Sequence, residues 1–174
     1  MSKLTDEILN KINYGWNLGN FFDCHEKGIT TKMSGNKTVD EVVKLWHNPN
    51  FNLMCLNNLK NAGVNCLRLP VTWCNFVDYN GKNYILNKEI FVRLKQIIDY
   101  ALNLDYVVIV DMHHDDKNWL NIAASDEEFE EVKNEYTQIW TQICKKFKDY
   151  GHNLVFEGMN ELINICNGNE DWMG

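Results

Sequence analysis

The chain has 174 residues, of which 45% are hydrophobic and 24% are charged, and its formal net charge is -7. This length suits one structural unit with its own core and is too short for two large domains. The acidic balance argues against a nucleic-acid partner, because phosphate binding ordinarily needs a basic face. No apolar run approaches the about 18 residues of a membrane span, and the start MSKLTDEILN lacks the apolar core of a signal peptide.

The first part of the chain predicts a strand followed by helical segments. Residues 12–20 read as a first strand that ends in a glycine-rich turn, YGWNLGN. Thr38 and Glu41 have the T-x-x-E spacing of a capping box, which predicts the start of a helix. A further helical segment is expected to end at Gly63, a residue type favoured just beyond a helix C-terminus.

The middle of the chain predicts two more strands separated by a helix. Residues 64–73, VNCLRLPVTW, read as a strand with Pro70 near its end, where a missing N–H is tolerated. Apolar residues then recur at helical spacing between Ile90 and Leu102. The uninterrupted branched run 107–110 is typical of a strand covered on both faces, as in a parallel sheet.

The last part predicts a long helix and a fourth strand. Apolar residues at helical spacing run from Phe129 to Phe147, Gly151 closes the segment, and LVFEGMNE follows as a strand. Strands that alternate with helices predict right-handed βαβ units and an α/β sheet. No linker or low-complexity tract divides the chain, so residues 1–174 are expected to form a single unit.

Polar residues follow each predicted strand at its downstream end. They are Asn17 and Asn20, then Arg68, then His113 and His114, then Asn160 and Glu161. In parallel α/β folds, ligands bind at that end of the strands, where the following loops converge. The sequence therefore predicts one site built from four strand ends.

The segments GWNLGN, LRLPVTW, VDMHHD and FEGMNE, in this order and spacing, resemble the first four strands of glycoside hydrolase family 5, most closely its bacterial endo-β-1,4-glucanases. The resemblance covers essentially the whole chain. It implies an eight-stranded (β/α) barrel, of which residues 1–174 would be the first half, about four β/α units of a TIM barrel.

The resemblance also implies roles for individual residues. Glu161 corresponds to the general acid/base, and Asn160 to the residue that contacts the sugar 2-hydroxyl. Arg68 corresponds to the arginine that orients the nucleophile's carboxylate, and His113 lines the neighbouring subsite.

Three further residues are expected to bind the substrate, a β-glucan oligo- or polysaccharide. They are Asn20, His114 and Trp73. No cofactor is expected. The run HHDD could suggest a metal site, but adjacent strand residues point to opposite faces, so His113 and His114 are not expected to bind one ion.

The second catalytic carboxylate is expected to be missing from this chain. Retaining glycosidases need two carboxyl groups about 5–5.5 Å apart, and in the family the nucleophile is a glutamate at the end of strand seven. Glu157 lies four residues before Glu161, roughly 13 Å upstream along a strand. It is expected to pair with Arg68 in the barrel interior, because a buried carboxylate needs a cation. Weak activity or none is expected from the chain alone.

Several alternatives stay open at this point. Four strands leave two sheet edges exposed, which predicts self-association, for instance a two-fold dimer in which His113, His114 or Asp115 of the partner copy stands near the missing nucleophile's position. Asp115 could then substitute for the nucleophile, but its shorter side chain is not expected to meet the required geometry. The chain could instead be a non-catalytic saccharide-binding fragment, or its other half could be supplied in trans. A polymeric substrate implies secretion. The preferred β-glycan is not fixed by these motifs.

Overall fold

The structure, a computed structural model, describes residues 3–26, 37–117, 119–120 and 125–161. Its main feature is a four-stranded sheet in the order β1-β2-β5-β6, in which every neighbouring pair is parallel. The strands are β1 (Tyr14–Asn17), β2 (Val64–Val71), β5 (Val107–Met112) and β6 (Leu154–Glu157). Spatial order follows sequence order, so the predicted α/β sheet of successive β/α units is confirmed.

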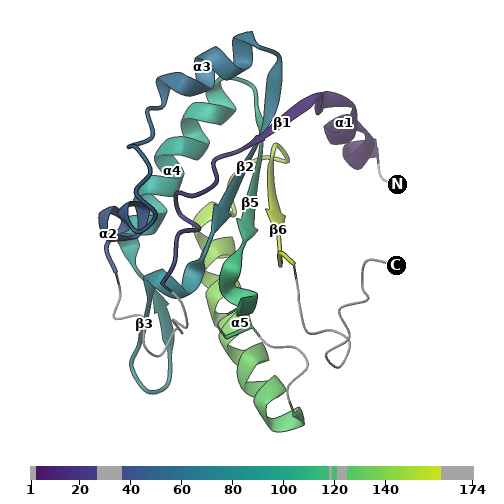
Figure 1. Cartoon of the computed structure of the whole chain (residues 1–174). Helices are drawn as coiled ribbons and strands as arrows, with labels where there is room; N and C mark the ends of the chain where they lie inside the picture. The colour runs from purple at the N-terminus through teal and green to yellow at the C-terminus, as the bar shows by residue number, and fades with distance from the viewer. Residues whose placement is uncertain (1–2, 27–36, 118, 121–124, 162–174) are drawn as a thin grey trace, which may run out of the picture.

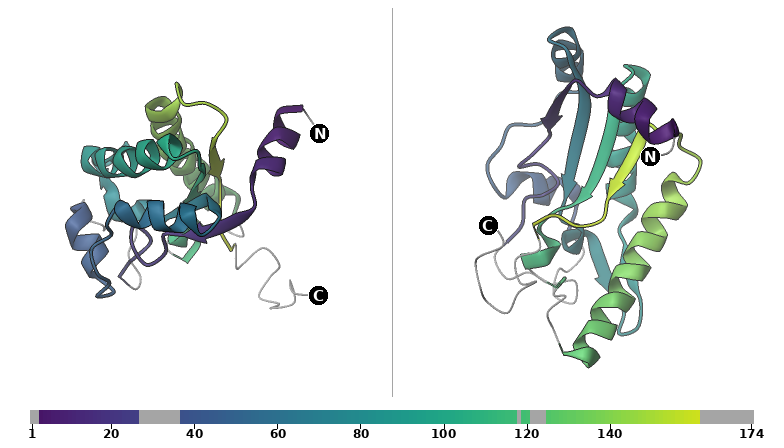
Figure 2. Two further views of the ribbon diagram at one scale, coloured as in Figure 1. Left: turned by 90° about the horizontal axis from the view of Figure 1, so that it is seen from above. Right: turned by 90° about the vertical axis from the view of Figure 1, so that its right-hand side faces the viewer.

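Three helices cover one face of this sheet, as Figures 1 and 2 show. They are α3 (Met54–Asn61), α4 (Lys88–Asn103) and α5 (Asp126–Phe147), with the short α2 (Val39–Lys44) beside them. The core lies between these helices and the sheet. It contains the predicted α4 stripe Ile90, Leu94, Ile97, Ile98 and Ala101, and the strand residues Leu67, Leu69, Val108 and Val110.

The opposite face of the sheet carries polar side chains. Side chains alternate along a strand, so Arg68 and Asp111 point away from the face that Leu67, Leu69 and Val110 give to the helices. In Figure 2, no element of the described part covers this face as the helices cover the other.

Several elements of the described part were not predicted from the sequence. Helix α1 (Lys3–Lys11) precedes β1 and buries none of its residues, and it projects away from the layer of α3, α4 and α5 (Figure 2). An antiparallel hairpin of β3 (Val77–Tyr79) and β4 (Tyr84–Leu86) interrupts the connection between β2 and α4. Short 3-10 helices follow β2, as η1 (Trp73–Phe76), and β5, as η2 (His114–Lys117).

Two local signals at helix ends behave as predicted, whereas Gly151 lies beyond the end of α5 at Phe147. The capping box at α2 is present: Glu41 N donates to Thr38 Oγ1 at 3.3 Å, and Thr38 N donates to Glu41 Oε2 at 2.8 Å. Gly63 follows α3 with a φ of 94°, a left-handed conformation that glycine adopts without a steric penalty. In the described part of the chain, no helix combines the length and apolarity needed to cross a membrane.

Replacing Gly63 by alanine should destabilise the fold by about 1 kcal/mol, because a side chain at this positive φ is strained. Gly151→Ala is the matched control, since a Cβ there meets nothing within 4 Å and its φ is ordinary. We expect Gly151→Ala to be neutral or slightly stabilising. Denaturant unfolding of the two variants measures the difference, and equal stabilities would contradict the assigned conformation.

Candidate active site

An ion-pair network joins three strands on the open face of the sheet. Arg68 of β2 donates from Nε to Glu157 Oε2 at 2.8 Å and from Nη2 to Glu157 Oε1 at 2.7 Å, so the two side chains form a two-point pair. Arg68 Nη2 also lies 2.7 Å from Asp111 Oδ2 of β5. The predicted pairing of Glu157 with Arg68 is confirmed, and the parallel register that sets Asp111 opposite Glu157 explains why both carboxylates reach one guanidinium.

Asp111 is the buried centre of this network. Asp111 is 0% exposed. Its Oδ2 lies 2.6 Å from His113 Nδ1 and also contacts Arg68 Nη2. Its Oδ1 has no hydrogen-bond partner among the described residues. Sequence reasoning did not select Asp111, although its place two residues before His113 was the available signal. Its hydrogen bond fixes the ring of His113 at the end of β5.

Asn160 is held at the same place by two contacts. Its Oδ1 accepts from Arg68 Nη2 at 3.0 Å, and its backbone N donates to Met112 O at 2.9 Å. Its Nδ2 is buried without a partner in the described part of the chain, which leaves a donor for a ligand oxygen. The next residue, Glu161, is exposed at the edge of this cluster. Three predicted residues, Arg68, His113 and Asn160, are therefore joined with Asp111 into one cluster, and Glu161 follows Asn160 in the sequence.

The network shifts the pKa values of its members in opposite directions. The hydrogen bonds from Arg68 lower the pKa of Glu157 below its usual value, and those same bonds raise the pKa of Arg68. Burial raises the pKa of Asp111, and the contacts with His113 and Arg68 oppose this rise only in part. The charged form of Glu157 is thus favoured, whereas ionised Asp111 is disfavoured by its dry surroundings.

His113 and His114 lie closer together than strand alternation predicts. Strand β5 ends at Met112 and η2 starts at His114, so the two rings turn toward one another with centroids 4.2 Å apart. Ligand atoms of Asp23, His113 and His114 all lie within 4.8 Å of one another. The prediction that His113 and His114 point to opposite faces is therefore wrong. Imidazole nitrogens and a carboxylate oxygen are donor types that zinc accepts.

Trp73 does not lie where a sugar contact needs it. Trp73 is 0% exposed and belongs to the core, where its ring centroid lies 6.3 Å from that of Phe91. The prediction that Trp73 binds substrate is wrong, because the chain leaves β2 at Val71 and η1 turns the indole under the helices.

Asp115 is likewise a structural residue. It is 0% exposed, and its carboxylate accepts from the backbone N of Trp73 and of Cys74 at 2.9 Å each and from Trp119 Nε1 at 2.7 Å. A buried carboxylate with three donors is not available to a partner copy, which agrees with the expectation that Asp115 is not a suitable replacement for the nucleophile.

An aromatic cluster that sequence reasoning passed over borders the histidines. The His25 ring lies 5.0 Å from the His114 ring and 5.5 Å from the Trp46 ring. Trp46 is 38% exposed, and its Nε1 donates to His25 O at 3.2 Å, which orients the indole. An exposed, oriented indole beside the site is a suitable surface for the apolar face of a sugar.

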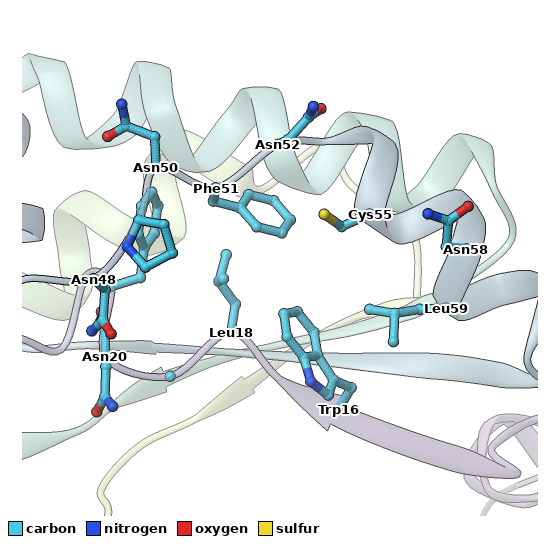
Figure 3. Close-up of a pocket in the computed structure, with 13 residues that line it drawn as sticks. Trp16, Leu18, Asn20, Asn48, Asn50, Phe51, Asn52, Cys55, Asn58 and Leu59 are labelled. Carbon is cyan, nitrogen blue, oxygen red and sulfur yellow. The ribbon is translucent and has the colours of Figure 1, made fainter.

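Asn20, the remaining predicted residue, lines a groove beside β1. It is exposed with a φ of 56°, and its carbonyl accepts from Asn48 Nδ2 at 2.6 Å. The groove, shown in Figure 3, has a volume of about 510 Å³. It is lined by Trp16, Leu18, Asn20, Phe51, Cys55 and Leu59, among others.

Comparisons with known proteins find related sequences over most of the chain. A family model described as Cellulase (glycosyl hydrolase family 5) matches residues 24–173. Endoglucanase A of Clostridium longisporum is 36% identical over 155 residues, which are 89% of this chain and 28% of that protein. Endoglucanase B of Clostridium cellulovorans is 34% identical over 170 residues, which are 98% of this chain and 34% of that protein.

Solved structures of related enzymes superpose on nearly the whole chain. A broad-specificity endoglucanase from Clostridium longisporum gives a TM-score of 0.82 at 29% identity, over 100% of this chain and 47% of that chain. A second broad-specificity endoglucanase, from Ruminococcus champanellensis with bound cellotriose, gives a TM-score of 0.81 at 26% identity, over 98% of this chain and 46% of that chain. These structures are TIM barrels, so the fold is an α/β partial barrel that spans about half of the solved chains and about a third of the curated relatives.

Replacing Glu157 by glutamine should change how the free energy of unfolding depends on pH in the acidic range. Because the pKa of Glu157 is lowered in the fold, its stabilising contribution is present above its usual pKa of 4.5 and is lost as the pH falls through the lower folded value. We expect Glu157→Gln to lower the free energy of unfolding at neutral pH by about 1–2 kcal/mol, less than for a fully buried pair because solvent screens it. The loss should shrink between about pH 5 and pH 3.

Denaturant unfolding across this pH range is the measurement. Glu130→Gln, on the exposed face of α5, is the matched control and should change little at any pH. Asp111 acts in the opposite sense, since its raised pKa means that its contribution falls as the pH rises through the folded value. A loss in Glu157→Gln that did not depend on pH would contradict the ion pair.

Proposed function

The chain belongs to glycoside hydrolase family 5, and we propose that it supplies the acid/base half of the active site of a retaining β-1,4-glucanase. The observation that carries this proposal is the network in which Arg68 holds both Glu157 and Asn160 at the downstream edge of the sheet. That network fixes the backbone just before Glu161, the carboxylate that the proposal needs.

Glu161 is proposed as the general acid/base. In the first step its carboxylic acid protonates the oxygen of the departing sugar, and in the second step its carboxylate takes a proton from the attacking water. Asn160 precedes it directly, and its unpartnered Nδ2 supports the role of a donor to the sugar 2-hydroxyl. His113, oriented by Asp111, would line the same subsite.

The attacking carboxylate is proposed to come from the other half of the barrel, on a continuation of this polypeptide or on a separate one. Glu157 does not suit this role, because its two oxygens are both bound by Arg68. Among the described residues, no hydrogen bond uses Arg68 Nη1, so this arginine retains donors for a carboxylate that approaches from outside the present sheet. Arg68 would thereby orient the nucleophile.

A neutral β-glucan is the proposed substrate. The relatives' names include endoglucanases and a structure with bound cellotriose. Within this chain, the exposed Trp46 and the rings of His25 and His114 support contacts with uncharged sugar faces. Action on a polymer outside the cell would require secretion, which is part of the proposal.

Glu161→Gln should abolish hydrolysis in a completed barrel. The test assembles this chain with the second half of a homologous endoglucanase and measures hydrolysis of a soluble cellulose derivative. We expect a loss of about 100-fold or more, since glutamine cannot exchange the proton, while cellotriose still binds. Glu130→Gln, the exposed α5 carboxylate, is the control and should retain activity. Unchanged hydrolysis in Glu161→Gln would contradict the assigned role.

A second candidate function is non-catalytic saccharide binding by a self-associating fragment. It is favoured by the edges of the sheet, because no strand in the described part pairs with the outer side of β1 or of β6. We expect the chain alone to hydrolyse weakly or not at all and to run above its monomer mass of 20.4 kDa. Solution mass, measured beside cellotriose binding and hydrolysis, separates the two functions. Robust turnover by a verified 20.4 kDa monomer would contradict both.

A further inference from the structure

Three side chains that follow two different strands meet beside the proposed active site. Ligand atoms of Asp23, His113 and His114 all lie within 4.8 Å of one another. Asp23 comes after β1 in the chain, whereas the two histidines follow β5, so the fold assembles the group. Three atoms with these separations share a central point within about 2.8 Å of each, and small side-chain rotations would bring them to the about 2.0–2.2 Å of bonds to zinc.

Asp23 is held in place by the loop after β1 and by the residue that follows β2. Its Oδ1 accepts from Phe21 N at 2.7 Å, and its backbone oxygen accepts from Thr72 Oγ1 at 2.9 Å. Asp23 is also 3% exposed. Its other carboxylate oxygen, Oδ2, can coordinate an ion while the contact with Phe21 is kept. Because the side chain is already ordered, binding an ion costs little further entropy.

His113 makes the hydrogen bond that metal-ligating histidines usually make. Its Nδ1 lies 2.6 Å from Asp111 Oδ2, and Asp111 is 0% exposed. A carboxylate bonded to one ring nitrogen fixes the orientation of the imidazole and makes its other nitrogen a better electron-pair donor. Nε2 of His113 is therefore the atom offered to an ion. The His113 side chain is 16% exposed, so an ion can reach it from solvent.

The ring of His114 is fixed by packing against other rings. Its centroid lies 4.2 Å from that of His113, 5.0 Å from that of His25 and 6.0 Å from that of Trp46. His114 starts η2 directly after the end of β5, which turns its imidazole toward that of His113. The two imidazoles are thus held as neighbours beside Asp23, and ligands held in advance favour metal binding.

The ligand types and the local charge indicate the class of ion. Two imidazole nitrogens and one carboxylate oxygen suit zinc and other divalent transition metals, whereas calcium and magnesium prefer oxygen ligands throughout. The hydrogen bonds of Glu157 and the charges of Asp111 and Asp23 raise the pKa of a single guanidinium. That guanidinium, on Arg68, offsets one of three negative charges, so a divalent cation is electrostatically favoured here.

We propose that Asp23, His113 and His114 bind a divalent transition-metal ion, for which zinc is the probe. Three protein ligands leave a fourth coordination position for water or for another oxygen ligand. The inference goes beyond the proposed function, because it needs neither Glu161 nor a second half of the barrel.

Equilibrium dialysis of the chain against ZnCl₂ measures the binding. Exposed thiols, which include those of Cys55 and Cys144, are first alkylated with iodoacetamide, because thiolates also bind zinc. We expect about one zinc ion per chain, and we expect neither Ca²⁺ nor Mg²⁺ at about tenfold excess to displace it. Absence of bound zinc would overturn the proposal, as would displacement by either of these two ions.

Substitutions test the assigned ligands. Asp23→Asn and His114→Ala should each weaken zinc binding by about tenfold or more, since each removes a ligand. Asp23→Asn keeps an amide oxygen for the Phe21 N–H, so this variant retains the contact that shapes the loop. His152→Ala, at an exposed position before β6, is the matched control and should bind zinc as the unaltered chain does. Equal binding by all three variants would overturn the proposal.

Histidine modification locates the ion without any substitution. Labelling by diethyl pyrocarbonate is followed peptide by peptide by mass spectrometry. With ZnCl₂ present, we expect labelling of His113 and His114 to slow by at least about tenfold and labelling of His152 to stay the same. Protection of His152 without protection of His113 and His114 would overturn the proposal.

Two outcomes separate this inference from the proposed function. Zinc bound by the chain, together with no hydrolysis by the completed barrel, would support the metal site and contradict the catalytic assignment. Hydrolysis by the completed barrel, together with no zinc bound by the chain, would do the reverse.

Discussion

The ion pairs of Arg68 are the constraint on which the rest of the site depends. One guanidinium on β2 binds carboxylates on β5 and β6 and the amide of Asn160, so a single side chain ties three strand ends together. Removing one charge from such a partly buried group would leave the charges of its partners without a counter-ion. This costs more free energy than the intact ion pair contributes to stability. The position of Asn160, and with it Glu161, follows from this network.

The network lies on the face of the sheet that the helices leave uncovered. Parallel strands are normally covered on both faces, and here the helices cover only the outer one. The inner face holds polar residues whose remaining partners, such as one for Asp111 Oδ1 and one for Asn160 Nδ2, are absent from the described residues. The inner polar face, the free edges of β1 and β6, and the apolar groove beside β1 all match the boundary of a partial barrel.

Sequence reasoning worked where the deciding forces are local or periodic. The capping box at Thr38, the glycine after α3 and the α4 stripe depend on residues a few positions apart, and all are present. The pairing of Glu157 with Arg68 was also predictable, because the rise of a strand fixes how far Glu157 lies from Glu161 and a buried carboxylate needs a cation. The placing of predicted polar residues at strand ends followed from the alternation of strands and helices.

Sequence reasoning failed where a strand stopped earlier than its apolar pattern. Trp73 continues the pattern of β2, yet the chain turns into η1 after Val71 and buries the indole in the core. His113 and His114 were assigned opposite faces by alternation, although β5 ends before them. Helix α1 was missed although Leu4, Ile8 and Leu9 stand at helical spacing; in the structure none of its residues is buried.

The sequence by itself determined the order of the four sheet strands and the helices between them, the resemblance to the family and the polar residues near the strand ends, because periodicity and short motifs carry this information. Only the tertiary structure decided which of those residues meet. The structure places Asp111 in the site and buries Trp73 and Asp115 away from it, because contacts between strands depend on register and on where each strand ends. The groove beside β1 has no sequence signature at all, since its floor is assembled from segments about 35 to 45 residues apart that only packing brings together.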